Sequence, residues 1–362
     1  MNIALLLYGN LDLLSGGFLY DRLLVDYLKK RGEEVDIVSL PWRKYVSGLL
    51  DNTFLTPTRL FKRKRYDLVL QDALAHPSLL RFNLEMKRGL KYPILSILHS
   101  LHSNEAHLFW NRAISRKLEE FYFQSVDGLV FNSDTTRIDA EAAAGRKLNG
   151  VVAYPGGDRL GSGLSEDEIV KRALRPGPLE ILFAGSLTRH KGLHILLAAL
   201  DRLSSIGSYG NWRLTVAGNE WMEPSYVHDI RSRIERSGWS PKVKLLGNLR
   251  PTEMANCFSR SHLLAVPSAY EGFGMAYIEG MAFGLPAIGS IRGAAREIIR
   301  DEENGFLLEP GDDRSLSCRI GRLVDRRDLL IELSLNAKRR HRAHPTWATS
   351  LATIHSFLRE FL

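Results

Sequence analysis

The chain alternates short apolar runs with longer segments of helical periodicity, and it does so in two successive series. This alternation is typical of parallel sheets with helices on both faces, because each strand is buried on both sides and each crossover is a helix. We expect strands at residues 3–7, 35–39, 68–71, 94–98, 129–131 and 151–153, then at 181–184, 214–217, 243–246, 263–266 and 287–288. The pattern predicts an α/β fold of two Rossmann-like domains.

The domain boundary is expected in a stretch rich in glycine and proline that begins at Pro155. At 362 residues the chain exceeds the size at which one core keeps growing, so two domains are expected. We predict an N-terminal domain at residues 1–157, a linker at 158–178 and a C-terminal domain at 179–345. After residue 311 the pattern is helical, and the amphipathic segment 346–362 is predicted to form a helix that crosses back to the first domain.

The formal net charge of +8 is shared evenly between the residues up to Gly157 and those after it, so neither half resembles a nucleic-acid-binding arm. Basic runs at 62–65 and 81–91 form either a solvated face or a contact with acidic lipid headgroups. The two cysteines, Cys257 and Cys318, indicate a reducing compartment. The apolar start reads as a first strand rather than a signal peptide. We expect a cytoplasmic protein, in peripheral contact with the inner face of a membrane if the basic runs bind lipid.

The most informative segment runs from residue 268 to 286, where a glycine-containing loop leads into a helix that begins near Met275. Unpaired N–H groups at such a helix start suit a diphosphate. Carboxylates accept hydrogen bonds from hydroxyls, so Glu279 can hold two ribose hydroxyls and Glu271 a hydroxyl of a donor sugar. Alternatively both are solvated, and Glu271 only favours the helix dipole.

A second phosphate-suited segment runs from Gly185 to Gly192 and opens the next helix. Its cations Arg189 and Lys191 can neutralise a leaving diphosphate, a role that a metal plays elsewhere, or they belong to a basic helix start on the surface. No two aspartates in the sequence are separated by one residue, so the Asp-x-Asp metal clip is absent. We therefore expect no metal site and no cofactor.

In the first domain, His99 follows the expected strand 94–98, at the end where open parallel sheets bind ligands. His102 is the competing candidate, and a structural role for either histidine stays open. The Gly16-Gly17 pair permits close approach of a ligand to the backbone.

Together these motifs resemble the family-four glycosyltransferases of the GT-B fold, within glycosyl transferases group 1, over nearly the whole chain. The matching motifs are Gly16-Gly17, the Ser-x-x-x-Arg element Ser133 to Arg137, the Gly-x-Asp element Gly156 to Asp158, the Gly-x-Leu-x-x-x-Lys-Gly loop from Gly185 to Gly192, and the segment from Glu271 to Glu279.

The resemblance implies retaining, metal-independent transfer from a nucleotide-diphosphate sugar to a hydroxyl of a glycan, a lipid-linked acceptor or a small molecule. The N-terminal domain is then the acceptor side, and the C-terminal domain binds the donor. Its implied catalytic residues are His99, which approaches the reacting sugar, Glu271, which contacts the transferred sugar, and Lys191, which contacts the diphosphate. The implied donor-binding residues are Gly17, Arg189, Lys191, Glu279 at the ribose, and the backbone amides of Phe273, Gly274, Met275 and Ala276.

Two positions depart from the family pattern. Ser186 stands where the family loop has arginine, so we expect Arg189 to supply the second cation for the diphosphate. The later Gly-Gly before a glutamate is here Gly293-Ala294. Two other functions are alternatives: an epimerase or phosphorylase of the same fold, for which the sequence has no matching motif, and a binding relative that has lost catalysis. The acceptor is left open, since the loops at 41–58 and 99–110 match no specific signature.

Overall fold

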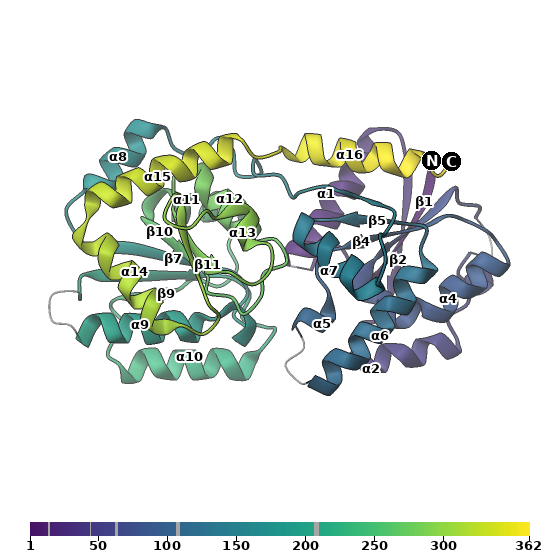
Figure 1. Ribbon diagram of the computed structural model, residues 1–362, viewed down its shortest axis with the longest axis horizontal. Coiled ribbons are helices and arrows are strands. Elements are labelled where there is room, and N and C mark those ends of the chain that lie inside the picture. The colour runs from purple at the N-terminus through teal and green to yellow at the C-terminus, as the bar shows by residue number, and fades with distance from the viewer. Residues whose placement is uncertain (14, 44, 62–63, 106–108, 206–209) are drawn as a thin grey trace. The chain divides into compact units, whose positions relative to one another are not determined.

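A computed structural model describes residues 1–13, 15–43, 45–61, 64–105, 109–205 and 210–362, except for the side chains of residues 105–111 (Figure 1). The chain divides into two compact units. The first unit comprises Met1–Pro155 and Ala348–Leu362, and the second comprises Gly156–Trp347.

The first unit is built on a parallel sheet in which the described residues form six strands, ordered β2-β1-β3-β4-β5-β6. The strands are β1 (Asn2–Tyr8), β2 (Glu34–Leu40), β3 (Leu68–Asp72), β4 (Ile94–Leu98), β5 (Gly128–Phe131) and β6 (Gly150–Val152). The helices are α1 (Gly16–Lys30), α2 (Tyr45–Gly48), α3 (Pro57–Leu60), α4 (His76–Arg88), α5 (His102–Glu105), α6 (Phe109–Ser125), α7 (Asp134–Ala144) and α16 (Trp347–Arg359), with short turns η1 (Leu49–Thr53) and η2 (Ala73–Ala75). All strand pairs are parallel, as the sequence predicts.

Strand order determines where this unit can hold a ligand. Every residue of β3 and β4 is buried, as expected for strands covered on both faces. The chain runs from β1 outward to β2 and returns on the other side of β1 to β3, so the order reverses at β1. In doubly wound sheets the crevice for a ligand lies at the carboxyl ends of the strands flanking such a reversal. Asp72 ends β3, and His99 follows β4 directly.

Helix α16 belongs to the first unit, apart from its first residue. The Nε2 atom of His355 donates to a carboxylate oxygen of Glu33 at 2.7 Å. Phe357 and Phe361 pack against Gly128, where an added Cβ atom would lie 2.8 Å from Cζ of Phe361. The predicted C-terminal helix is therefore confirmed.

The second unit repeats the architecture, and its described residues form a parallel sheet of order β12-β11-β10-β7-β8-β9. The strands are β7 (Leu179–Ala184), β8 (Trp212–Ala217), β9 (Val243–Leu245), β10 (Leu263–Ala265), β11 (Ala287–Ser290) and β12 (Gly305–Leu308). The helices are α8 (Glu166–Leu174), α9 (Leu193–Ser205), α10 (Pro224–Arg236), α11 (Pro251–Arg260), α12 (Met275–Ala282), α13 (Ala295–Ile298), α14 (Asp313–Asp325) and α15 (Arg327–Arg342), with a short turn η3 (Arg189–Lys191).

Strand β12, four residues long, is not among the strands predicted from the sequence. It pairs with β11 in parallel register, from Ala287 opposite Gly305 to Ser290 opposite Leu308. Glycine is required at the first of these pairs, since a Cβ atom on Gly305 would lie 2.1 Å from the carbonyl oxygen of Ala287.

Residues 158–178, predicted as a linker, belong to the second unit and contain helix α8. The buried guanidinium of Arg172 donates to the carbonyls of Phe283 and Gly284, each at 2.8 Å. His262 donates from Nε2 to the carbonyl of Arg172 and accepts at Nδ1 from the amide of Glu180, so its ring is neutral. Burial lowers the pKa of His262 to about 4. These contacts hold α8 against the body of the second unit.

In the described part of the chain, no helix combines the length and apolar character that crossing a bilayer would require.

Candidate active site

Two loops at the carboxyl ends of the adjacent strands β7 and β10 are joined into one surface. We call them the lysine loop (residues 185–192) and the glutamate loop (residues 266–274). The carbonyl of His190 accepts a hydrogen bond from the amide of Ala269 at 2.8 Å. The Nε2 atom of His190 donates to the carbonyl of Tyr270 at 2.6 Å. Gly192 has a φ of +76°, and an added Cβ atom would lie 2.2 Å from the carbonyl oxygen of Pro267. The two loops are therefore packed backbone to backbone.

Lys191 and Glu271 form an ion pair across these loops. The Nζ atom of Lys191 lies 2.9 and 2.8 Å from the two carboxylate oxygens of Glu271. Ser268 donates to the same carboxylate at 3.0 Å. The side chain of Glu271 is 9% exposed and that of Lys191 27% exposed. The lysine neutralises the carboxylate at a site that solvent can still reach.

The backbone of Glu271 is held by the loop that contains the second departure from the family pattern. Its amide donates to the carbonyl of Arg292 at 3.2 Å, and its carbonyl accepts from the amide of Ala294 at 2.7 Å. Gly293 has a φ of +87°, and an added Cβ atom would lie 2.2 Å from the carbonyl oxygen of Glu271. Only the first glycine of the family pair is needed for this contact, and alanine is accommodated at the second position.

Helix α12 begins directly after the glutamate loop, and no side chain in the described residues caps its first turn. Gly274 at the N-cap has a φ of +96°, and an added Cβ atom would lie 2.4 Å from Cδ2 of Tyr277. The hydroxyl of Tyr277 donates to the carbonyl of Val266 at 2.6 Å. The helix start therefore lies on a buried tyrosine. The amides predicted to bind the donor, those of Phe273, Gly274, Met275 and Ala276, lie at this helix start and follow Glu271 closely in the chain.

Glu279 lies further along α12 and is paired with a residue that the sequence analysis did not select. Arg159 donates from Nε and Nη2 to the two carboxylate oxygens at 2.6 and 3.0 Å, a bidentate geometry. The side chains are 23% exposed for Arg159 and 7% exposed for Glu279. The sequence feature that could have indicated Arg159 is its position directly after the Gly-x-Asp motif. The aspartate of that motif, Asp158, accepts a hydrogen bond from the amide of Trp347 at 2.8 Å.

Arg189 lies on a different surface of the lysine loop. Its guanidinium lies 5.5 Å from the ring centroid of Tyr226 and 3.4 Å from Asp229, both on α10. The side chain is 63% exposed. The structure thus brings Lys191 to Glu271 and places Arg189 against α10, so Arg189 must leave these partners to serve as the second cation for a diphosphate.

In the first unit, His99 donates from Nε2 to the carboxylate of Asp21 at 3.0 Å. A Cβ atom on Gly17 would lie 2.9 Å from Cδ2 of His99, so the predicted glycine and histidine are in direct contact. The competing His102 stacks on Tyr45, with ring centroids 3.8 Å apart. Burial disfavours charge on His99, but Asp21 raises its pKa above the usual value.

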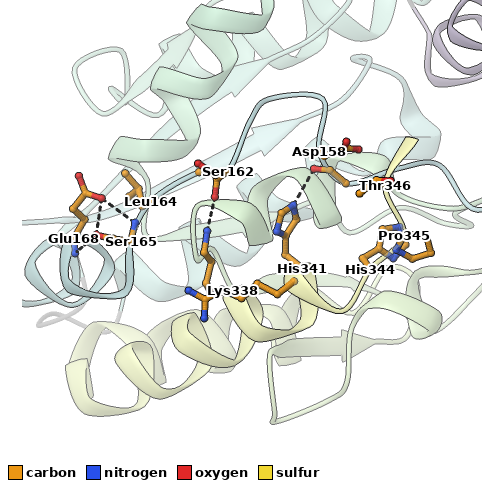
Figure 2. Close-up of a pocket in the computed structure, with 13 residues that line it drawn as sticks. Asp158, Ser162, Leu164, Ser165, Glu168, Lys338, His341, His344, Pro345 and Thr346 are labelled. Atoms are coloured by element: carbon orange, nitrogen blue, oxygen red, sulfur yellow. Dashed lines mark hydrogen bonds between the residues drawn. The ribbon is translucent and has the colours of Figure 1, made fainter. Parts of the chain in front are cut away.

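A pocket of about 570 Å³ in the second unit lies between the loop that precedes α8 and the end of α15 (Figure 2). Lys338 donates to the carbonyls of Ser162 and Ala282, and His341 donates from Nε2 to the carbonyl of Gly157. None of the predicted site residues lines this pocket. Two predicted features lie outside the described residues: Lys62 and Arg63 of the first basic run, and part of the loop 99–110.

Comparison with known proteins finds similarity to glycosyltransferases. Residues 165–340 match the family described as glycosyl transferases group 1. Glycogen synthase from Mycobacterium tuberculosis is 25% identical over 256 residues, which are 70% of this chain and 58% of the relative. D-inositol 3-phosphate glycosyltransferase from Corynebacterium urealyticum is 27% identical over 246 residues, 64% of this chain and 57% of the relative. The chain therefore spans less than two thirds of the length of these curated relatives.

Solved structures match over the whole chain. Sucrose-phosphate synthase from Thermosynechococcus elongatus has a TM-score of 0.81 at 19% identity, covering 99% of this chain and 98% of that one. HepE from Anabaena, solved in complex with UDP-glucose, has a TM-score of 0.75 at 20% identity, covering 99% and 100%. The fold is that of the GT-B glycosyltransferases, which confirms the predicted fold class. Residues 165–340, a little under half of the chain, are thus similar to glycosyl transferases group 1.

Proposed function

We propose that this chain is a retaining hexosyltransferase of family four that uses a nucleotide-diphosphate sugar and needs neither metal nor cofactor. The observation that supports this most directly is the Lys191–Glu271 ion pair at the uncapped start of α12. An ammonium group and the N–H groups at a helix start bind a diphosphate, and the adjacent carboxylate accepts a sugar hydroxyl. These groups recognise two adjoining parts of one donor, its diphosphate and its sugar.

The proposed binding mode uses the second glutamate for the ribose. Each carboxylate oxygen has two lone pairs, and the fork of Arg159 uses one on each oxygen of Glu279. One lone pair on each oxygen remains for the two ribose hydroxyls. Arg159 therefore orients Glu279 in this proposal, and Lys191 remains the cation for the diphosphate.

The proposed reaction breaks the bond between the anomeric carbon and the phosphate oxygen and forms a bond from that carbon to the acceptor oxygen on the same face. The acceptor proton passes to the leaving phosphate oxygen, so no enzymatic base is required. Lys191 and the amides of Phe273, Gly274, Met275 and Ala276 stabilise the departing diphosphate. A well-placed donor of this kind contributes on the order of 3 kcal/mol to transition-state stabilisation. In this proposal His99 of the first unit approaches the reacting sugar, and Gly17, which lies against its ring, is a donor-binding residue.

The donor class has support from relatives. HepE was solved with UDP and with UDP-glucose, so we propose a nucleotide sugar of this kind as the first donor to test. For the acceptor we propose a glycan, a lipid-linked glycan or a small molecule with a free hydroxyl. A lipid-linked acceptor fits a cytoplasmic protein in peripheral contact with an anionic membrane through basic residues 81–91. Failure to bind phosphatidylserine vesicles at low salt would count against that version.

The experiment is a panel of nucleotide sugars offered to chelator-treated protein, with binding measured by thermal shift and hydrolysis by released nucleotide. Lys191→Met and Arg189→Met are compared as matched cation removals from one loop. We expect one donor to stabilise the wild type and to be slowly hydrolysed, and Lys191→Met to weaken donor binding at least about tenfold.

If Arg189→Met has the same effect, Arg189 is the second cation. If it binds donor like the wild type, that role belongs to another residue. Binding of donor without hydrolysis would favour an inactive relative, and hydrolysis that requires added metal would refute metal independence.

A further inference from the structure

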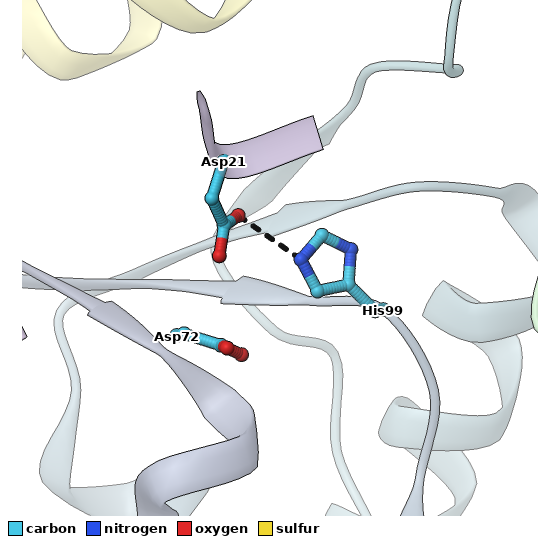
Figure 3. Close-up of side chains that lie close together, drawn as sticks. All are labelled: Asp21, Asp72 and His99. Carbon is cyan, nitrogen blue, oxygen red and sulfur yellow. Dashed lines mark hydrogen bonds and ion pairs between the residues drawn. The ribbon is translucent and has the colours of Figure 1, made fainter. Parts of the chain in front are cut away.

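Three ionisable side chains from separate elements meet in the first unit (Figure 3). Asp21 comes from α1, Asp72 ends β3, and His99 follows β4. A carboxylate oxygen of each aspartate and a ring nitrogen of His99 all lie within 4.8 Å of one another. Asp21 is fully buried, Asp72 is 2% exposed, and the side chain of His99 is 20% exposed. Two buried carboxylates therefore lie beside the histidine that the proposed function uses.

Not every oxygen of these two carboxylates accepts a hydrogen bond. Asp72 accepts from the amide of Leu74 at 2.9 Å, and Asp21 accepts from His99 through Oδ1. The other oxygen of Asp21, Oδ2, is buried and has no hydrogen-bond partner among the described residues. A buried carboxylate oxygen without a partner is strongly disfavoured unless a positive charge lies close by. Among the three groups, only the imidazole of His99 can supply that charge.

The ring of His99 is in contact with residues of α1. Gly17 lies against one side, and the ring of Tyr20 contacts it edge-on, with centroids 5.3 Å apart. Asn132 donates to the backbone carbonyl of His99 at 2.7 Å. Nε2 is committed to Asp21, and Nδ1 points away from both carboxylates (Figure 3). Nδ1 has no hydrogen-bond partner in the part of the chain that the structure describes.

We propose that Asp21 and Asp72 are positioning residues that hold His99 as an imidazolium, so that Nδ1–H donates to a substrate oxygen bound at the carboxyl edge of the first sheet. This role rests on the proposed function, whereas the charge state of His99 does not. A neutral ring with Nε2 donating to Asp21 would leave Nδ1 as an acceptor. The two carboxylates therefore decide whether the ring accepts or donates a hydrogen bond.

The titratable groups that face His99 are Asp21 and Tyr20 from α1 and Asp72 from β3, with Tyr122 from α6 facing Asp72. Burial and the nearby Asp21 raise the pKa of Asp72 to about 7. Burial raises the pKa of both tyrosines far above neutrality, so they remain uncharged. Asp72 therefore changes charge near neutral pH, and the pKa of His99 lies above its usual value because of Asp21. Donor turnover should fall as pH rises and His99 loses its proton.

The test uses the full chain labelled with ¹⁵N-histidine, with the His99 resonances assigned by comparison with His99→Gln. The imidazole is titrated by NMR in the wild type, in Asp21→Asn and in Asp72→Asn. Asp26→Asn is the matched control, since Asp26 is an exposed aspartate on the same helix. We expect Asp21→Asn to lower the pKa of His99, Asp72→Asn to lower it less, and the control to leave it unchanged.

Donor hydrolysis provides the second readout. Asp21→Asn should lower kcat about tenfold at neutral pH and move the alkaline limb of its pH profile to lower pH, with KM for the donor unchanged. A His99 that titrates identically in the wild type and in Asp21→Asn would overturn the proposal. So would a divalent cation, Zn²⁺ or Mn²⁺, that stabilises the chelator-treated wild type but not Asp21→Asn, because the cluster would then be a metal site. If only the proposed function is wrong, the protein will not bind the donor, but His99 will still titrate as expected.

Discussion

The pair between Arg159 and Glu279 allows a prediction about the second unit that does not depend on activity. The two side chains meet in bidentate geometry at 2.6 and 3.0 Å, and both are largely buried. Replacing Glu279 with alanine leaves an arginine with no counter-ion, and replacing Arg159 leaves a buried carboxylate. Replacing both leaves neither charge behind.

The expected magnitudes follow from burial. Removing one partner of a fully buried pair costs about 3 to 5 kcal/mol, whereas exposed pairs contribute about 0 to 1 kcal/mol. Arg159 is 23% exposed, so each single variant should lose about 2 kcal/mol of unfolding free energy. The double variant should lose about 2 kcal/mol rather than the sum of the two single losses, because it leaves no unpaired charge behind. The resulting coupling energy is about 2 kcal/mol.

The assay is guanidinium denaturation followed by tryptophan fluorescence. Tryptophans 212, 221, 239 and 347 lie in the second unit, and substituting Trp42 and Trp110 with phenylalanine restricts the signal to it. The control is the exposed pair Arg300–Glu303, whose side chains are 66% and 54% exposed. This pair should show almost no coupling. Additivity of the Arg159 and Glu279 substitutions within about 0.5 kcal/mol would refute the reasoning.

Two further predictions concern backbone geometry and pH. Gly293→Ala should destabilise the second unit by about 3 kcal/mol, because the new Cβ atom meets the carbonyl of Glu271 and φ is positive, whereas Gly311→Ala should cost about 1 kcal/mol. Gly311 has a φ of +83° with nothing within 4 Å of an added Cβ atom, so equal losses would show that the clash is relieved. The pKa of His262 is lowered from 6.5 to about 4, so the unfolded chain binds its proton more readily, and about 3 kcal/mol of stability should be lost as pH falls from 6.5 to 4. His262→Gln should flatten that dependence in denaturation measured against pH, and an unchanged slope would contradict it.

The features that the sequence predicted well are local. Apolar runs of two to five residues marked the predicted strands, because a strand buried on both faces needs a continuous apolar segment. Glycine positions marked the tight turns, as at Gly192 and Gly274, where φ is positive. Ser133, part of the family resemblance, accepts from the amide of Thr136 as the N-cap of α7, a contact contained within four residues.

Errors arose where a short segment depended on distant partners. Strand β12 is four residues long, and its pairing with β11 defines it as a strand. Residues 158–178 have the glycine and proline content of a linker, yet Arg172 holds α8 against carbonyls more than a hundred residues away. No window of sequence contains both halves of such a contact.

The sequence by itself determined the two-sheet architecture, the loops that carry the lysine and the glutamates, and the spacing of Glu271 and Glu279 along one segment. The tertiary structure alone decided the partners: Lys191 for Glu271, Arg159 for Glu279, and Asp21 with Asp72 for His99. Local periodicity and turn chemistry act over a few residues and can be read along the chain. The partner of a buried charge is set by which strand ends and loops the packing of the sheet brings together, over separations of 80 and 120 residues for the two glutamates.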